Sequence, residues 1–120
     1  MRLSSKLLID EAPLQVLPSL AELVGLNEAI FLQQLHYWLQ KASFHDKDGL
    51  PWVYNTYEDW HKQFPFWSLA TMRRIIGKLE VANLIESTRE HNKWKQDQTK
   101  WYTINYLVLV HLNNEMNRSE

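Results

Sequence analysis

Residues 67–82 combine side chains that could contact a nucleic acid. Ser68 is a suitable N-cap, and the good helix formers that follow predict a helix from Leu69 to about Ala82. One face of this helix carries small, polar and basic side chains: Trp67, Ala70, Thr71, Arg74 and Lys78, with Arg73 and Gly77 at its margins. Arginine can bind guanine edges through two hydrogen bonds, and threonine can contact a phosphate or a thymine methyl group. An ordinary solvated helix face fits the same residues.

A second candidate region follows at residues 84–104. The β-prone segments Leu84–Arg89 and Thr99–Ile104 predict the two strands of a hairpin with a long polar tip. The tip carries Trp94 between Lys93 and Lys95. An exposed indole between two ammonium groups could lie along a minor groove or stack on an unpaired base. Alternatively, Trp94 folds back onto the hairpin or contacts a partner chain.

The charge distribution connects these two regions. The chain has 120 residues with 13 basic and 14 acidic side chains, so its net charge is −1. Residues 67–104 carry seven basic and four acidic side chains, a net of +3, which leaves −4 for the remainder. Phosphate binding with release of counterions needs such a local basic patch rather than a basic total. The residues expected to contact DNA are Trp67, Ser68, Thr71, Arg73, Arg74, Lys78, Arg89, Lys93, Trp94, Lys95 and Lys100.

Other kinds of chemistry have little support in the sequence. There is no cysteine, which excludes disulfides and thiolate metal sites and suits a reducing cytoplasm. The five histidines show no paired metal spacing, and the single Glu58–His61 motif is too little for a di-iron bundle. No phosphate-binding glycine loop or nucleophile elbow is present. We therefore expect no enzymatic activity, no cofactor and no metal, and we find no segment apolar and long enough to cross a membrane.

The elements that would position the candidate residues follow from local signals. Leu7–Glu11 and Trp52–Tyr54 predict short strands, and Thr56 with Asp59 resembles a capping box. The remaining predicted helices are Pro18–Val24, Glu28–Ala42 with Asn27 as its cap, Tyr57–Gln63, and Tyr106–Met116 beginning near Asn105.

Apolar periodicity predicts the core. In the helix over residues 28–42 one broad apolar face is formed by Phe31, Leu32, Leu35, Trp38, Leu39 and Ala42, and a smaller edge by Ile30 and Tyr37. In the helix over residues 69–82 the inner face is formed by Leu69, Met72, Ile76 and Leu79, with Ile75 at its edge. Of the six tryptophans, Trp38, Trp60 and Trp101 are expected in the core, whereas the pattern does not place Trp52.

The order of elements predicts an α+β chain, mainly α with a small β-hairpin. A short helix, a tight turn, a longer helix and a hairpin are typical of a winged helix-turn-helix, here with extra N- and C-terminal helices. We expect one domain over residues 1–120, with its core at about 18–106 and a C-terminal helix at 107–120.

Several segments together resemble the N-terminal winged-helix domain of replication initiator proteins. Such initiators occur in phages and mobile elements of low-GC Gram-positive bacteria, and the domain is similar in layout to that of DnaD-like primosome proteins. The segments that carry the resemblance are Leu26–Leu39, Trp52–Trp60, Phe64–Ser68, Arg73–Ile76 and Thr99–Ile104. The resemblance covers roughly residues 5–106.

The resemblance implies a bacterial cytoplasmic protein that binds double-stranded DNA at origin repeats through the third helix and the hairpin. It also implies a rival function, because DnaD-like domains self-associate into homodimers or higher oligomers. Here Leu7–Ile9, Ile30, Tyr37 and Leu107–Val110 could supply that surface. Such proteins usually continue into a C-terminal region that recruits a helicase loader, so the resemblance implies that this chain is an isolated or truncated domain. A transcriptional repressor of the same fold would show the same sequence features.

Overall fold

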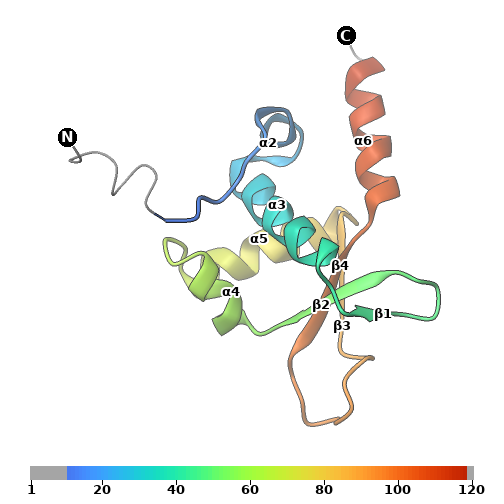
Figure 1. Cartoon of the computed structure of the whole chain (residues 1–120). Helices are drawn as coiled ribbons and strands as arrows, with labels where there is room; N and C mark the ends of the chain where they lie inside the picture. The colour runs from blue at the N-terminus through green and yellow to red at the C-terminus, as the bar shows by residue number, and fades with distance from the viewer. Residues whose placement is uncertain (1–10, 119–120) are drawn as a thin grey trace.

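The computed structural model describes residues 11–118, which form an α+β fold of helices around a small antiparallel sheet (Figure 1). The expected strand at Leu7–Glu11 lies outside the described residues except for Glu11, which is not in a strand. The elements in chain order are α2 (Pro18–Val24), α3 (Leu26–Gln40), β1 (Phe44–His45), β2 (Pro51–Asn55), α4 (Tyr57–Gln63), α5 (Leu69–Val81), β3 (Ile85–Thr88), β4 (Lys100–Ile104) and α6 (Tyr106–Arg118).

Four strands form one sheet in the order β1-β2-β4-β3, and each neighbouring pair is antiparallel. The predicted hairpin is confirmed: β3 and β4 pair with Ser87 opposite Tyr102. Tyr102 also lies opposite Val53 of β2, so the short predicted strand near Trp52 adds a third member beside β4. The two-residue strand β1 was not predicted, because Phe44–His45 is too short to show alternation.

Gly25 forms the boundary between the first two helices. Helix α2 has the predicted bounds, with proline in its first turn and Gly25 directly after its end. Helix α3, however, begins at Leu26 and is capped by Gly25, so the prediction that Asn27 is the cap was wrong. Gly25 has φ +103°, a conformation that other residues rarely adopt, and this allows the chain to turn between two helices without a linker. Helix α3 ends at Gln40, two residues before the predicted end.

The inward face of α3 confirms most of the predicted core. Phe31, Leu32, Leu35 and Leu39 are buried. Trp38 is 37% exposed, so its prediction as a core residue was wrong. Its ring lies at the rim, where the indole N–H donates a 2.8 Å hydrogen bond to Gln63 of α4. A tryptophan on the margin of a helical face can reach a polar partner that periodicity does not show.

Helix α4 is fixed by the predicted capping box. The Asp59 N–H donates to the Thr56 hydroxyl at 3.0 Å, and the Thr56 N–H donates to the Asp59 carboxylate at 3.1 Å. The helix then buries Trp60 completely, with its ring 4.9 Å from that of Phe31 and 5.6 Å from that of Tyr102. This aromatic contact joins α4 to both α3 and the sheet.

Helix α6 projects away from the body at the end of the molecule opposite to the β3–β4 loop (Figure 1). Asn105 alone separates it from β4. The Asn105 N–H donates to the Leu84 carbonyl at 2.9 Å, and its side-chain amide donates to the Asn83 carbonyl at 2.7 Å. Asn105 therefore ties the start of α6 to the connection between α5 and β3. Within the described residues no helix combines the length and apolarity that a membrane crossing requires.

Candidate nucleic-acid interface

Helix α5 is capped at its start as predicted. The Ser68 hydroxyl accepts a 3.1 Å hydrogen bond from the Thr71 N–H and donates one of the same length to the Thr71 hydroxyl. The inner face differs in one respect from the prediction, because Ile75 is fully buried whereas Leu69 is exposed. The buried face of α5 is therefore centred closer to Ile75 than the sequence predicted. Ala70, Arg73, Arg74 and Lys78 are exposed, and Thr71 is half-buried at the margin.

Trp67 does not lie on the exposed face, and its inclusion among the residues of that face was wrong. It is only 7% exposed, and its ring is stacked on Phe64 at 4.7 Å between centroids. Trp67 precedes the helix, so its position follows the turn after Pro65 rather than the helical period. The neighbouring Phe66 is exposed instead, with its ring edge-on to Trp67 at 5.2 Å. Nothing in the apolar run around Pro65 distinguishes the exposed ring from the buried ones.

Tyr57 links the basic side chains of α5 to those of the hairpin. The Arg73 guanidinium carbon lies 5.2 Å from the centre of the Tyr57 ring, and the Lys100 ammonium lies 6.0 Å from the same centre. Both distances are within the range of cation–π attraction. Tyr57, Arg89 and Lys100 also line one cleft of about 350 Å³, together with Glu58 and Gln98. The sequence did not indicate Tyr57, because the contact joins three separate elements.

Lys78 is the one predicted contact residue with an acidic partner in the described part of the chain. Its ammonium lies 3.7 Å from a carboxylate oxygen of Glu28, and the side chains are 60% and 7% exposed respectively. Glu28 is in the first turn of α3, where the helix dipole favours a negative charge. Arg74, one turn before Lys78, has no ion-pair partner among residues 11–118. Arg74 is therefore freer than Lys78 to bind an external anion.

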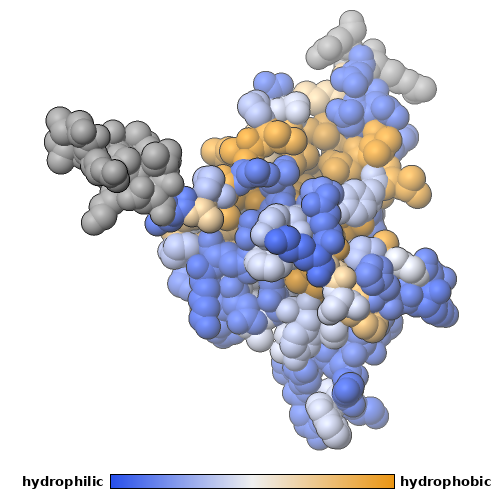
Figure 2. Space-filling model, viewed as in Figure 1, coloured by the Kyte–Doolittle hydropathy of each residue, from blue (hydrophilic) through white to orange (hydrophobic). Residues whose placement is uncertain are grey.

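The β3–β4 loop, residues 89–99, presents the remaining predicted residues. Arg89 is exposed and its Nε–H donates to the Gln98 carbonyl at 3.3 Å. Lys93, Trp94 and Lys95 are all exposed, and 71% of the surface of Trp94 is accessible. The interpretation in which Trp94 folds back onto the hairpin is therefore not supported. Figure 2 shows mainly hydrophilic colours over this projecting end.

An aromatic cluster that the sequence did not indicate lies at the base of this loop. Trp101 is half-buried in it, with ring centroids 4.8 Å from both Phe44 and Tyr54. His91 lies between Phe44 and Trp52 at 4.9 Å from each ring. Trp52, which the pattern did not place, is buried and donates its indole N–H to Asp46 at 2.8 Å. The pairing of β1 with β2 places Phe44 beside Trp52, and the pairing of β2 with β4 places Tyr54 beside Trp101. Because β1 was not predicted, the sequence did not indicate the cluster.

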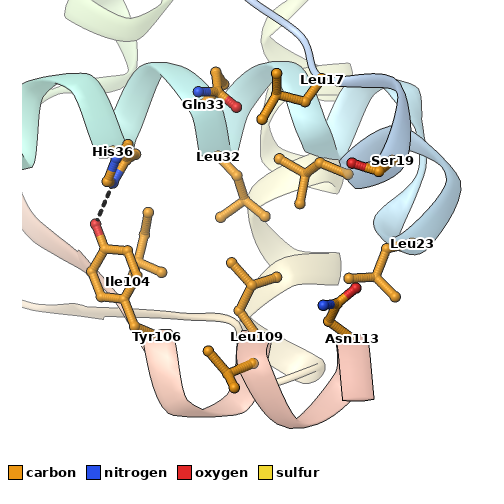
Figure 3. A pocket seen from close by; sticks show the side chains of 12 residues that line it. Leu17, Ser19, Leu23, Leu32, Gln33, His36, Ile104, Tyr106, Leu109 and Asn113 are labelled. Carbon is orange, nitrogen blue, oxygen red and sulfur yellow. Dashed lines mark hydrogen bonds between the residues drawn. The ribbon is translucent and has the colours of Figure 1, made fainter. Parts of the chain in front are cut away.

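A separate apolar pocket of about 390 Å³ lies between α2, α3 and α6 (Figure 3). Leu17, Leu32 and Leu109 point into it, and His36 is hydrogen-bonded to the Tyr106 hydroxyl at 2.7 Å on one side. Burial raises the pKa of the Tyr106 hydroxyl above its ordinary value. Hydrophobic colours gather over the same end of the molecule in Figure 2.

The described residues contain no group of three histidine, aspartate or glutamate side chains that could hold a metal ion. Comparison with protein-family models, curated proteins and solved structures finds no significant match to this chain.

Proposed function

We propose that this protein is a winged helix-turn-helix module that binds specific double-stranded DNA at a replication origin. Helices α4 and α5 supply the helix-turn-helix, α5 is the recognition helix, and β3 and β4 with their loop form the wing. The order α3, β2, α4, α5, β3, β4 supports this assignment. The origin as the target rests on the sequence resemblance to replication initiators.

The observation that carries the proposal is the shared position of Arg73 and Lys100 on the Tyr57 ring. The contact brings one cation of α5 and one cation of β4 to the same ring, which supports treating the exposed face of α5 and the hairpin as one binding surface. Arg74 and Lys78 would reach into the major groove, with Arg73 beside them. Ser68, Thr71, Arg89 and Lys100 would contact phosphates, while Lys93, Trp94 and Lys95 follow the backbone or minor groove.

The test is selection of bound duplexes from a random pool at stated salt, followed by affinity measurements on the selected sequence. We expect a consensus, and we expect Arg74→Ala combined with Lys78→Ala to weaken its binding by about 3 kcal/mol. The matched control is Lys41→Ala with Lys47→Ala, which removes the same charge from exposed positions outside α4, α5 and the wing. Equal losses in the two double variants, or no loss in either, would remove α5 as the recognition helix.

A second candidate function is an oligomerisation or protein-docking module with weak, non-specific DNA affinity. The observation that favours it is the apolar surface of α6, where Leu107 is 87% and Val110 is 55% exposed beside the pocket of Figure 3. It predicts a concentration-dependent dimer or tetramer in sedimentation that Leu107→Lys disrupts, and no selected DNA sequence. A transcriptional repressor would instead select a site at a promoter.

A further inference from the structure

The wing contains a cleft of about 350 Å³ that is distinct from the basic surface of α5. Its lining comes from β1, β2, the wing loop and β4. The residues that line it are Phe44, Tyr54, His91, Asn92, Lys93, Trp94, Asp97 and Trp101. Aromatic rings thus form much of its lining.

Hydrogen bonds hold the wall of the cleft in place. The Trp101 indole N–H donates to the Asn92 side-chain oxygen at 2.8 Å, and the Asn92 amide donates to the carbonyls of Asp97 and Thr99. The Tyr54 hydroxyl donates to the Asp97 carboxylate at 2.6 Å. These polar groups already have partners inside the protein. His91 also lines the cleft, and its Nε2 atom is buried without a hydrogen-bond partner among the described residues. Apart from Lys93, the cleft offers a ligand chiefly the faces and edges of aromatic rings.

Trp94 is the most exposed ring of the cleft, with 71% of its surface accessible against 45% for Tyr54. Among the described residues it has no neighbouring aromatic ring at contact distance, although Tyr54 and Trp101 line the same cleft. Lys93 and Lys95 flank it and have no ion-pair partner in the described part of the chain. The arrangement offers a flat apolar face beside two positive charges, and the ligand that matches it has a flat ring joined to phosphates.

We propose that this cleft binds one unpaired nucleobase of a single-stranded nucleic acid, by stacking against Trp94. A base within a duplex has both faces covered by its neighbours, so only an unpaired base can enter. Lys93 and Lys95 hold the flanking phosphates. Because every base has an aromatic face, and stacking on an indole does not depend on the polar atoms that the base carries, the site accepts all four bases. The inference does not require that the protein recognise a duplex sequence.

The test compares two single strands of about 12 nucleotides, an oligothymidylate and an abasic strand of equal length, by fluorescence anisotropy at one salt concentration. The wild-type protein is expected to bind the oligothymidylate about 10-fold more tightly, since stacking of one base contributes roughly this factor. In Trp94→Leu this preference disappears, whereas affinity for the abasic strand stays the same. Tyr37→Leu, which removes another exposed aromatic ring from α3, is the matched control and keeps the preference.

Lys93→Ala combined with Lys95→Ala separates stacking from charge. This variant is expected to bind both strands more weakly and to keep the preference for thymidylate. Equal wild-type affinity for the two strands would overturn the proposal, as would a preference that survives Trp94→Leu. If the protein prefers oligothymidylate but selects no duplex sequence, this base-binding site is supported and the proposed duplex recognition fails. If it selects a duplex sequence but binds the two single strands equally, the duplex recognition is supported and this site is overturned.

Discussion

The Lys78 ammonium lies 3.7 Å from the carboxylate of Glu28, so the C-terminal half of α5 is tied to the first turn of α3. Glu28 is almost completely buried, whereas Lys78 remains largely exposed. The pair therefore holds a carboxylate directly behind a side chain that we expect to contact DNA. Any phosphate that binds Lys78 competes with this internal anion.

Removal of that anion is expected to strengthen DNA binding. In Glu28→Gln the shape of the side chain is kept and the charge is lost, so affinity for duplex DNA should rise about 2- to 5-fold at low salt. Stability should change by less than about 1 kcal/mol, because Lys78 is exposed to solvent. Titration of labelled duplex measures the first effect. Glu22 is an exposed acidic residue on α2, so Glu22→Gln makes the same change in net charge away from Lys78 and serves as the control. An equal gain in DNA affinity in this variant would show that the effect of Glu28→Gln does not come from its contact with Lys78.

Substitution by alanine should change the free energy of unfolding in opposite directions at Gly25 and Gly77. Gly25 has φ +103°, which strains any other residue, and a Cβ there would also clash with a carboxylate oxygen of Glu28. We expect Gly25→Ala to lower the free energy of unfolding by about 1–3 kcal/mol. Gly77 is inside α5 and has open space around its Cβ position, so Gly77→Ala should raise it by about 0.5–1 kcal/mol. Urea unfolding of both variants checks the pair.

Tyr57 is expected to affect DNA binding through the cations above its ring. Tyr57→Leu removes the aromatic face under Arg73 and Lys100, and should weaken duplex binding about 3- to 10-fold while costing about 1 kcal/mol in stability. Tyr57→Phe keeps the ring and should bind DNA almost as tightly as the wild type. If both variants bind equally well, the ring does not position the two cations. Titrations at two salt concentrations measure the effect.

Trp67 should matter for stability rather than for recognition. Trp67→Ala removes a buried ring that is stacked on Phe64, and the expected loss is about 3–5 kcal/mol. Trp67→Phe preserves the stacking and should fold well enough for DNA titration, with affinity near that of the wild type. A large loss of affinity in a stably folded Trp67→Phe protein would restore Trp67 as a contact residue. Thermal unfolding together with duplex titration decides between the two roles.

The Asp46 carboxylate should make the β1–β2 hairpin sensitive to acid. Hydrogen bonds from the Trp52 indole and from the backbone N–H groups of Leu50 and Asp48 hold the pKa of Asp46 below its ordinary value of 3.8. The pKa of Asp46 is lower in the folded protein than in the unfolded chain, so the ionised carboxylate stabilises the fold. This stabilisation is complete above about pH 4 and is lost as the pH falls through the pKa of Asp46 in the folded protein. The indole N–H resonance of Trp52 followed by NMR reports the change. In Asp46→Asn this dependence should disappear, whereas it should persist in Asp48→Asn.

Features that depend on a few adjacent residues could be predicted. The capping box of Thr56 and Asp59 and the Ser68 cap each need only three or four residues, so the starts of α4 and α5 were predicted correctly. The hairpin followed from β-prone composition on either side of a polar tip. Asn27 was a reasonable cap by type, but Gly25 already ended one helix and began the next, which residue preference alone does not show.

Most of the candidate site depended on contacts between distant segments. The ion pair of Lys78 with Glu28 and the ring contacts of Tyr57 join elements far apart in the chain, so helical spacing could not show which cations are free. The prediction for Trp67 extended the helical face to the residue before the Ser68 N-cap. The error was geometric, because a residue ahead of the N-cap does not follow the helical period.

The position of Asn105 between β4 and α6 fixes the direction in which any partner bound along α6 would lie. A single residue separates β4 from α6, and that residue is hydrogen-bonded to both Asn83 and Leu84. The direction of α6 is therefore set by β4, the strand that also ends the β3–β4 loop. A molecule docked on Leu107 or Val110 would thus take a defined angle and distance relative to that loop, and replacement of Asn105 would release this alignment without removing either surface.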